Sequence, residues 1–221
     1  MKTVTFEDVK NSEEIKTCIR QADASLLALG YTEHAFAHVM RCADLASRWL
    51  LQLGYSEREA ELARIAGYMH DIGNLVNRAD HAQSGAIIAY DILTRMGMPV
   101  GDVAAVVTAI GNHDEPTACP VNSIAAALIL ADKTDVRRSR VRNNETIRFD
   151  IHDRVNYAVE KATTSLDVEK RVLTLSLEVD TEICAVMDYF EIFLERMLLC
   201  RRAAEFFKLH FQLVINGSAL M

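Results

Sequence analysis

Five of the seven histidines of this chain lie between residues 34 and 113, on or at the ends of segments with helical periodicity. They are His34, His38, His70, His81 and His113. Their neighbours along the chain are mostly Ala, Ile, Val and Leu, so packing of the helices would bury the rings. Burying an imidazole without a strong polar partner costs roughly 1 to 3 kcal/mol. A shared metal ion would be such a partner, and the pattern predicts helices packed around one polar centre.

Helical periodicity extends along most of the first 160 residues. The expected helices cover residues 12–29, 33–53, 58–73, 81–96, 103–115, 124–138 and 151–162. Gly54 suits a helix C-terminus, and the Ser56 to Glu59 stretch has the pattern of a capping box. Asp102 is the expected N-cap of the fifth helix, and Asn122 or Ser123 that of the sixth.

The pattern changes after residue 162. Residues 171–179 and 207–215 alternate with the period of a strand, and the segment 181–204 between them is helix-like. We expect the strands to pair with each other, which is also compatible with a homodimer through this tail. The predicted fold is mainly α, with an all-helical domain over residues 1–162 and a small α/β appendage with about two strands over residues 163–221.

Charge and composition limit the partners. Lys and Arg number 24 against 31 Asp and Glu, a net charge of −7 that disfavours nucleic acid, because phosphate backbones are held by excess cations. Five scattered cysteines without a C-x-x-C pair indicate reduced thiols. The absence of a long apolar run or an apolar leader predicts a protein without a membrane segment, located in the cytoplasm.

Two acids accompany the histidines. Asp71 directly follows His70, and Asp132 interrupts the apolar stretch IAAALILADK. Imidazole and carboxylate donors, with no thiolate expected close by, favour a divalent ion such as manganese, iron, cobalt or zinc.

The order His, His-Asp, His, His, Asp resembles that of the HD-domain superfamily of metal-dependent phosphohydrolases, from about residue 31 to 145. The matching segments are HVMRC, SEREAELARIAGYMHDIG, DHAQSGAIIA, IGNHDE and ILADKTD. A His-Asp pair alone is a weak signal, whereas five motifs in order are a specific one. The resemblance implies a helical bundle around one or two divalent ions per chain.

The resemblance also implies roles for residues. One ion would be held by His38, His70, Asp71 and Asp132, and a second, bridged through Asp71, by His81 and His113. Asp71 would then be the central catalytic residue. His34 lies one turn before His38 and could replace it as the first ligand. The distance to Gly54 and the HVMR context favour His38, which leaves His34 to support a ligand or contact substrate.

Asn74 departs from the lysine that several branches of the family carry at this position. An amide cannot neutralise phosphate, although it can bind substrate through hydrogen bonds. The expected cations are Arg78, Lys133 and Arg137, with Lys133 also expected to act in catalysis beside Asp71. The further candidates are Arg138, Arg140 and Arg142.

The implied function is hydrolysis of a small phosphate ester, a nucleotide or a phosphodiester, by attack of metal-bound hydroxide. Two other classes remain open. A minority of proteins with this ligand order hold two irons and oxidise an organic substrate, and a catalytically silent signalling module could share the fold. A silent module would be expected to have lost ligands, and this chain has the complete set.

Overall fold

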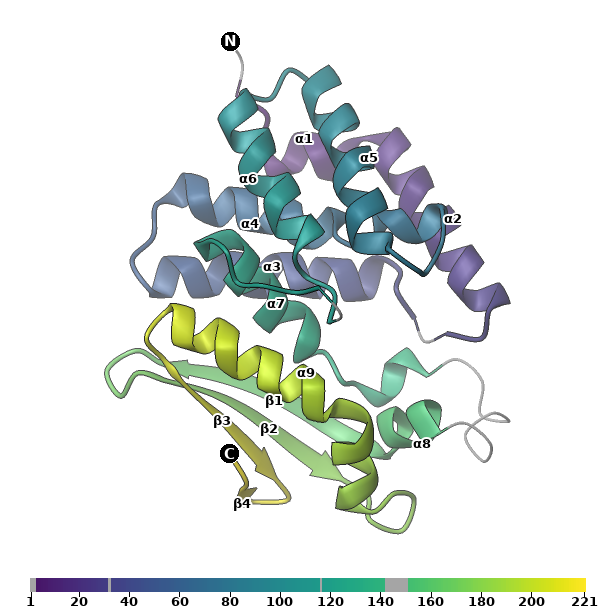
Figure 1. Ribbon diagram of the computed structural model, residues 1–221, viewed down its shortest axis with the longest axis vertical. Coiled ribbons are helices and arrows are strands. Elements are labelled where there is room, and N and C mark those ends of the chain that lie inside the picture. Colours follow the sequence, from purple (N-terminus) through teal and green to yellow (C-terminus); the bar gives the residue numbers. More distant parts are fainter. Residues whose placement is uncertain (1–2, 32, 116, 142–150) are drawn as a thin grey trace. The chain divides into compact units, whose positions relative to one another are not determined.

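A computed structural model describes residues 3–31, 33–115, 117–141 and 151–221, except for the side chains of 151–153. The chain forms two compact units, Met1–Asp132 and Lys133–Met221. The first contains helices, and the second combines helices with a small sheet (Figure 1), so the predicted fold class is confirmed. Among the described residues, no helix is both long and apolar enough to cross a membrane.

The first unit is built from α-helices and one 3-10 turn. Their bounds are α1 Phe6–Asn11, α2 Glu13–Ala28, α3 Phe36–Gln52, α4 Glu57–Met69, η1 Ile72–Leu75, α5 His81–Arg95, α6 Val100–Gly111 and α7 Ser123–Lys133, whose last residue begins the second unit. Helix α1 was not expected from the sequence.

Local capping signals set several of these helix ends. The Ser56 hydroxyl accepts from the backbone N–H of Glu59, whose carboxylate accepts in return, as the capping box requires. Gly54 follows α3 with a φ of +83°, a left-handed conformation that glycine adopts without strain. The Asn122 side chain accepts from the N–H of Ala125 at 2.7 Å and caps α7.

Asp102 is not the N-cap of α6, so this prediction was wrong. Pro99 occupies the N-cap position and Asp102 lies inside the first turn. The Asp102 carboxylate instead accepts from Arg58 of α4 at 2.7 Å. A long-range ion pair therefore takes the side chain that local pattern alone assigned to the helix end.

Helices α3 and α4 approach each other closely at Gly67. A β-carbon at this glycine would lie 2.7 Å from the backbone of Ala43, closer than packing allows. This contact lies one turn before His70 on α4, and five residues after His38 on α3. The close approach of the two backbones is what brings these two histidines near each other.

The second unit contains a four-stranded sheet. Its elements are η2 Arg138–Arg140, α8 Ile151–Ala158, β1 Val159–Asp167, β2 Val172–Val179, α9 Val186–Phe206, β3 His210–Ile215 and β4 Ser218–Ala219. The strand order is β1-β2-β3-β4. Strands β2 and β3 pair in parallel, with Leu173 opposite Phe211, while β1 and β4 join as antiparallel edges. Helix α9 is the crossover between β2 and β3 (Figure 1).

The two predicted strands and their pairing are confirmed, whereas the number of strands was too low. The helix expected over 151–162 ends at Ala158, and the chain continues directly as β1. This edge strand exposes Lys161, Thr163 and Ser165, so it lacks the apolar alternation that marks a half-buried strand. The domain boundary expected near residue 163 falls inside β1, and the second unit begins at Lys133.

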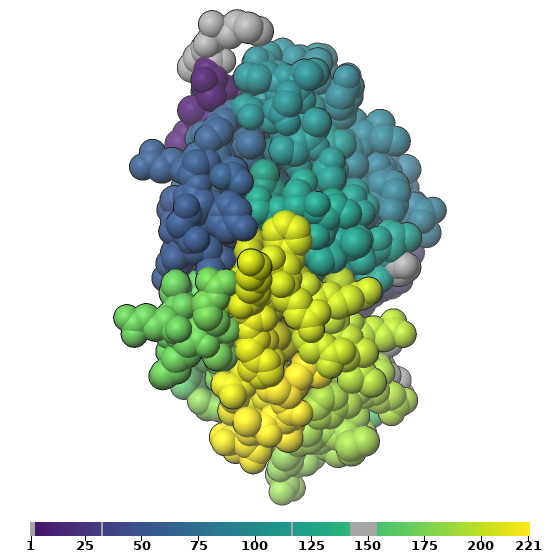
Figure 2. Space-filling model, turned by 60° about the vertical axis from the view of Figure 1, so that its left-hand side comes forward, coloured from purple at the N-terminus to yellow at the C-terminus, as the bar shows by residue number. Residues whose placement is uncertain are grey.

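Helix α9 has both a buried and an exposed face. Tyr189, Phe193 and Met197 are buried at helical spacing. Met187 and Leu194 are exposed. Helix α9 forms much of the yellow-green to yellow face in Figure 2. The homodimer through this tail stays a prediction.

Candidate metal centre

Six buried polar side chains come together in the first unit. They are His38 from α3, His70 and Asp71 from the end of α4, His81 from the start of α5, His113 just after α6 and Asp132 from α7. Their exposed fractions range from 0% to 8%. Elements far apart in the sequence thus deliver the six predicted ligands to one place.

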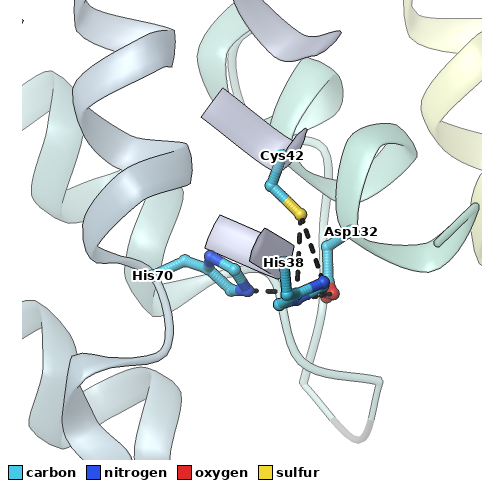
Figure 3. Close-up of side chains that lie close together, drawn as sticks. All are labelled: His38, Cys42, His70 and Asp132. Atoms are coloured by element: carbon cyan, nitrogen blue, oxygen red, sulfur yellow. Dashed lines mark hydrogen bonds and ion pairs between the residues drawn. The ribbon is translucent and has the colours of Figure 1, made fainter. Parts of the chain in front are cut away.

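The first group surrounds one oxygen of Asp132. Its Oδ1 lies 3.2 Å from His38 Nε2 and 3.7 Å from His70 Nε2. Figure 3 shows these three side chains pointing toward one another. Asp71 Oδ2 faces the same two imidazoles, at 3.6 Å from His38 and 3.3 Å from His70.

The second group lies at the other oxygen of Asp71. Its Oδ1 is 3.5 Å from His81 Nε2, which in turn is 3.2 Å from His113 Nε2. The His70 and His113 rings are also neighbours, with centroids 4.9 Å apart. The carboxylate of Asp71 therefore has one oxygen directed at each group.

Backbone carbonyls set the tautomers of three of these histidines. The Nδ1 atoms of His70, His81 and His113 lie 2.8, 3.1 and 2.6 Å from the carbonyl oxygens of Gly67, Arg78 and Ile110. A carbonyl oxygen only accepts hydrogen bonds, so Nδ1 carries the proton in each neutral ring. The lone pair is then on Nε2, which faces the centre, as in histidines that ligate metals.

Electrostatics at the first group favour a cation. Burial alone would lower the pKa of His70, but Asp71 and Asp132 raise it to about 10. Burial alone would raise the pKa of Asp71, but His70 and His34 hold it well below its ordinary value. His70 Nε2 and Asp71 Oδ2 are buried and lie 3.3 Å apart, but neither atom makes a hydrogen bond of normal geometry among the described atoms. A divalent ion between these atoms would satisfy both, so the residues fit a metal.

Comparison with known families matches residues 35–191 to the HD domain. The chain belongs to the HD-domain family. The match supports a metal-dependent hydrolase family whose domains bind divalent metals, and the matched range contains all six clustered side chains.

One similar solved structure is a crystal structure of a predicted HD superfamily hydrolase from an uncultured Thermotogales bacterium. The two sequences are 28% identical. The match covers 56% of this chain and 67% of the chain in that structure, with a TM-score of 0.43. No curated protein matches the chain.

His34 lies beside the HD-domain cluster rather than in it. Its ring centroid is 5.6 Å from that of His38, and its backbone N–H donates to Asp23. His38, by contrast, faces both Asp71 and Asp132. His34 is still close enough to lower the pKa of Asp71, and the preference for His38 as the first ligand stays a prediction.

Asn74 is turned toward Asp71. Its side-chain amide donates to the Asp71 backbone carbonyl at 2.9 Å and to Oδ1 at 3.0 Å. Asn74 is buried, and its own Oδ1 has no hydrogen-bond partner among the described atoms. The side chain expected to bind substrate thus holds the central carboxylate in orientation.

The basic side chains predicted to bind phosphate contact different parts of the structure. Arg78 Nη1 lies 3.3 Å from His81 Nε2, and Nη2 lies 3.9 Å from Asp114. Lys133 and Arg137 belong to the second unit, where Lys133 is buried and Arg137 donates to both carboxylate oxygens of Asp135. Arg138 lies beside Tyr157, Arg140 donates to the Asp135 carbonyl, and Arg142 is outside the described residues. Arg78 therefore contacts the metal cluster through His81.

Two neighbours of the cluster were not expected from the sequence. Cys42 is fully buried with its Sγ 3.7 Å from both ring nitrogens of His38, so the expectation of no thiol close by was wrong. Asp114 Oδ2 lies 3.8 Å from His81 Nδ1. Two features of the sequence could have indicated these neighbours. Cys42 follows His38 by four residues, which places it on the same helix face, and Asp114 directly follows His113.

A surface pocket of about 630 Å³ lies beside His81. Tyr31, Arg78, Gln83 and Asp114 are among its lining residues, and the Arg78 guanidinium lies 5.7 Å from the Tyr31 ring centre. The volume falls in the range of small-molecule sites, about 300 to 1,000 Å³. Because Arg78 and Asp114 also contact His81, the pocket adjoins the second group of the cluster.

Proposed function

We propose that this HD-domain protein is a metal-dependent phosphohydrolase that cleaves a small phosphate ester, such as a nucleotide or a phosphodiester. The observation that carries the proposal is the placement of Asp71, with Oδ2 facing His38 and His70 and Oδ1 facing His81. One carboxylate directed at two separate donor groups is the arrangement that a two-ion hydrolytic site uses. Paired divalent ions supply a water of lowered pKa and offset the negative charge that develops on a phosphoester.

The chain's own residues organise this centre. In the proposed site, His38, His70, Asp71 and Asp132 would hold one ion, and His81, His113 and Asp71 would hold a second. Backbone carbonyls keep three imidazoles in the tautomer whose lone pair faces the centre. The Asn74 amide donates one hydrogen bond to the Asp71 backbone carbonyl and one to carboxylate Oδ1, and so holds the carboxylate in orientation.

The pocket supports a substrate of small size. Arg78 combines contact with His81 and a place in the pocket wall, so its guanidinium can meet a phosphate that reaches the cluster. The exposed ring of Tyr31 offers an apolar face to the rest of the ester. The net negative charge of the chain agrees with a small ester rather than a polymeric nucleic acid.

Metal-dependent release of phosphate tests the proposal. Metal-free protein is reloaded separately with manganese, iron, cobalt or zinc and assayed for phosphate release from nucleotides, phosphodiesters and generic monoesters. Activity should be lost with a chelator and return with metal. If no phosphate is released and the iron-loaded protein consumes oxygen with an organic phosphonate or polyol, the oxygenase replaces the hydrolase. Absence of both reactions would leave a silent module.

Arg78→Ala should weaken substrate binding while metal content stays unchanged. The lost guanidinium removes a charge-assisted contact worth about 1.5 to 3 kcal/mol, so kcat/KM should fall about 10-fold or more, mainly through KM. Arg64→Ala is the matched control, because Arg64 pairs with Asp44 on the surface of the same unit. An unchanged KM in the Arg78 variant would remove the arginine from the substrate site.

Metal affinity should rise with pH. His70 has its pKa raised to about 10 in the metal-free chain, so the imidazole is protonated at neutral pH and must lose that proton to bind an ion. Because the pKa of His70 is higher in the folded chain than in the unfolded chain, protonation of His70 stabilises the metal-free fold at pH values below the unfolded pKa of about 6.5. This contribution is lost as the pH rises through the folded pKa of about 10. Calorimetric titration with zinc in two buffers of different ionisation enthalpy should detect proton release. Binding without proton release, at an affinity independent of pH, would contradict this expectation.

A further inference from the structure

The pocket beside His81 has an acidic wall, although the proposed substrate carries a negative phosphate. Its lining residues come from the C-terminal end of α2, the turn before α5, the first turn of α5 and the loop after α6, all within the first unit. Of the described residues that line it, Arg78 is basic, and Asp80 and Asp114 are acidic. The arrangement of these three charges indicates which part of a substrate each of them meets.

The charges of Arg78 and Asp114 offset each other next to the metal centre. Arg78 Nη2 lies 3.9 Å from Asp114 Oδ1. Both side chains also contact His81, Arg78 at 3.3 Å and Asp114 at 3.8 Å. This end of the pocket is therefore close to neutral before an ion binds, and bound ions would make it positive. It suits the phosphate group of an ester.

Asp80 supplies a negative charge without such a counterpart. It occupies the N-cap position of α5, but its side chain makes no capping hydrogen bond, and its backbone is left-handed with a φ of +55°. The side chain is exposed, and no hydrogen bond or ion pair to its carboxylate is found among the described residues. An ionised carboxylate only accepts hydrogen bonds, so it attracts donor groups and repels a second anion.

Gln83 and Thr117 add neutral polar groups to the same wall. Gln83 Nε2 donates to Thr117 Oγ1 at 3.0 Å, which connects α5 to the loop after α6. This bond leaves the Gln83 carbonyl oxygen as an acceptor and the Thr117 hydroxyl proton as a donor for a ligand. Tyr31 and Leu29 line the pocket with exposed apolar surface. The wall therefore suits an uncharged group that is partly apolar and carries hydroxyls.

We infer that this pocket selects a phosphate ester with a single phosphate and an uncharged, hydroxyl-bearing organic group, and that Asp80 rejects a second anionic group. The inference rests on the proposed function, because it requires the phosphate to lie at the metal centre beside Arg78. A hydroxyl of the organic group donates to the Asp80 carboxylate, and its apolar part packs against Tyr31. A nucleoside monophosphate meets this description. A nucleoside diphosphate or triphosphate, or an ester that carries a carboxylate, would bring a second negative group against Asp80.

Binding of phosphonates measures this selectivity without hydrolysis. Zinc-loaded protein is titrated by calorimetry with para-hydroxymethyl phenylphosphonate and with para-carboxy phenylphosphonate, which are similar in size and differ in the group opposite the phosphonate. Zinc has no redox chemistry that could oxidise these compounds. The hydroxymethyl compound should bind about 5-fold more tightly or better, which is the effect of two unit charges about 4 Å apart in water.

Asp80→Asn should remove most of this preference. Asparagine keeps the size of the side chain and tolerates a left-handed backbone, so the helix start should be preserved. The ratio of the two affinities should fall to about 2-fold or less, mainly because the carboxy compound binds more tightly. Asp91→Asn removes the same charge from the exposed surface of α5, outside the pocket lining, and should keep the wild-type ratio.

Equal affinities for the two phosphonates in the wild type, or no binding of either, would overturn the inference. An unchanged ratio in the Asp80 variant would do the same, as would an equal change in the Asp91 variant. If the preference is found but no ester releases phosphate, the selectivity of the pocket stands and the proposed hydrolysis fails.

Discussion

Asp71→Asn should remove bound metal and hydrolytic activity together. The substitution keeps the side-chain shape but replaces one oxygen with an amide nitrogen and removes the negative charge that both donor groups share. Losing several kcal/mol of transition-state stabilisation corresponds to a decrease in kcat/KM of about 1,000-fold or more. Elemental analysis of the purified variant and a phosphate-release assay measure the two losses.

Asp91→Asn is the control for this variant. Asp91 lies on the exposed surface of α5, where it pairs with Arg95 at 2.9 Å. Such a pair contributes only about 0.3 to 0.5 kcal/mol, so metal content and activity should match the wild type. If Asp71→Asn retained its full complement of metal, the bridging role of the carboxylate would be wrong.

Gly73→Ala should damage both the fold and the metal centre. A β-carbon at this position would lie 1.9 Å from the carbonyl oxygen of His81 and 2.5 Å from the backbone nitrogen of Gly85. These are backbone atoms of α5, so the helix has to shift and carry His81 away from Asp71. We expect a loss of about 3 kcal/mol in the free energy of unfolding and a melting temperature lower by roughly 10 °C, together with weaker metal binding.

Gly101→Ala separates this effect from a general response to alanine. Gly101 lies in α6, and a β-carbon there would have no atom within 4 Å. Because alanine is the better helix former, this variant should be more stable by up to about 1 kcal/mol. Equal melting temperatures for Gly73→Ala and the wild type would contradict the close contact between η1 and α5.

Local signals explain why much of the helical unit could be predicted. The Ser56–Glu59 capping box and the left-handed Gly54 are decided by residues within one turn, so the sequence displays them. Helix α1 carries a similar box between Thr5 and Asp8 that the prediction overlooked. Asp102 shows the limit, because its partner Arg58 is 44 residues away and competes with the local cap.

Some strands could be predicted from the sequence, and one could not. Strands β2 and β3 were visible because one side of each is buried and the residues alternate. Strand β1 was not, since an edge strand with exposed Lys161, Thr163 and Ser165 has no apolar alternation to detect. Its assignment depends on pairing with β2, which is a tertiary contact.

The sequence by itself determined which residue types were available for a metal centre, their order along the chain and the helices that carry them, because periodicity and caps are local properties. Only the tertiary structure decided how these side chains meet. The near-contact of α3 and α4 backbones at Gly67 brings His38 and His70 together, and the same fold places Cys42 beside them. Distances of 3 to 4 Å between side chains from different helices depend on where the helices cross. That crossing is set by packing across the whole core, which no local pattern encodes.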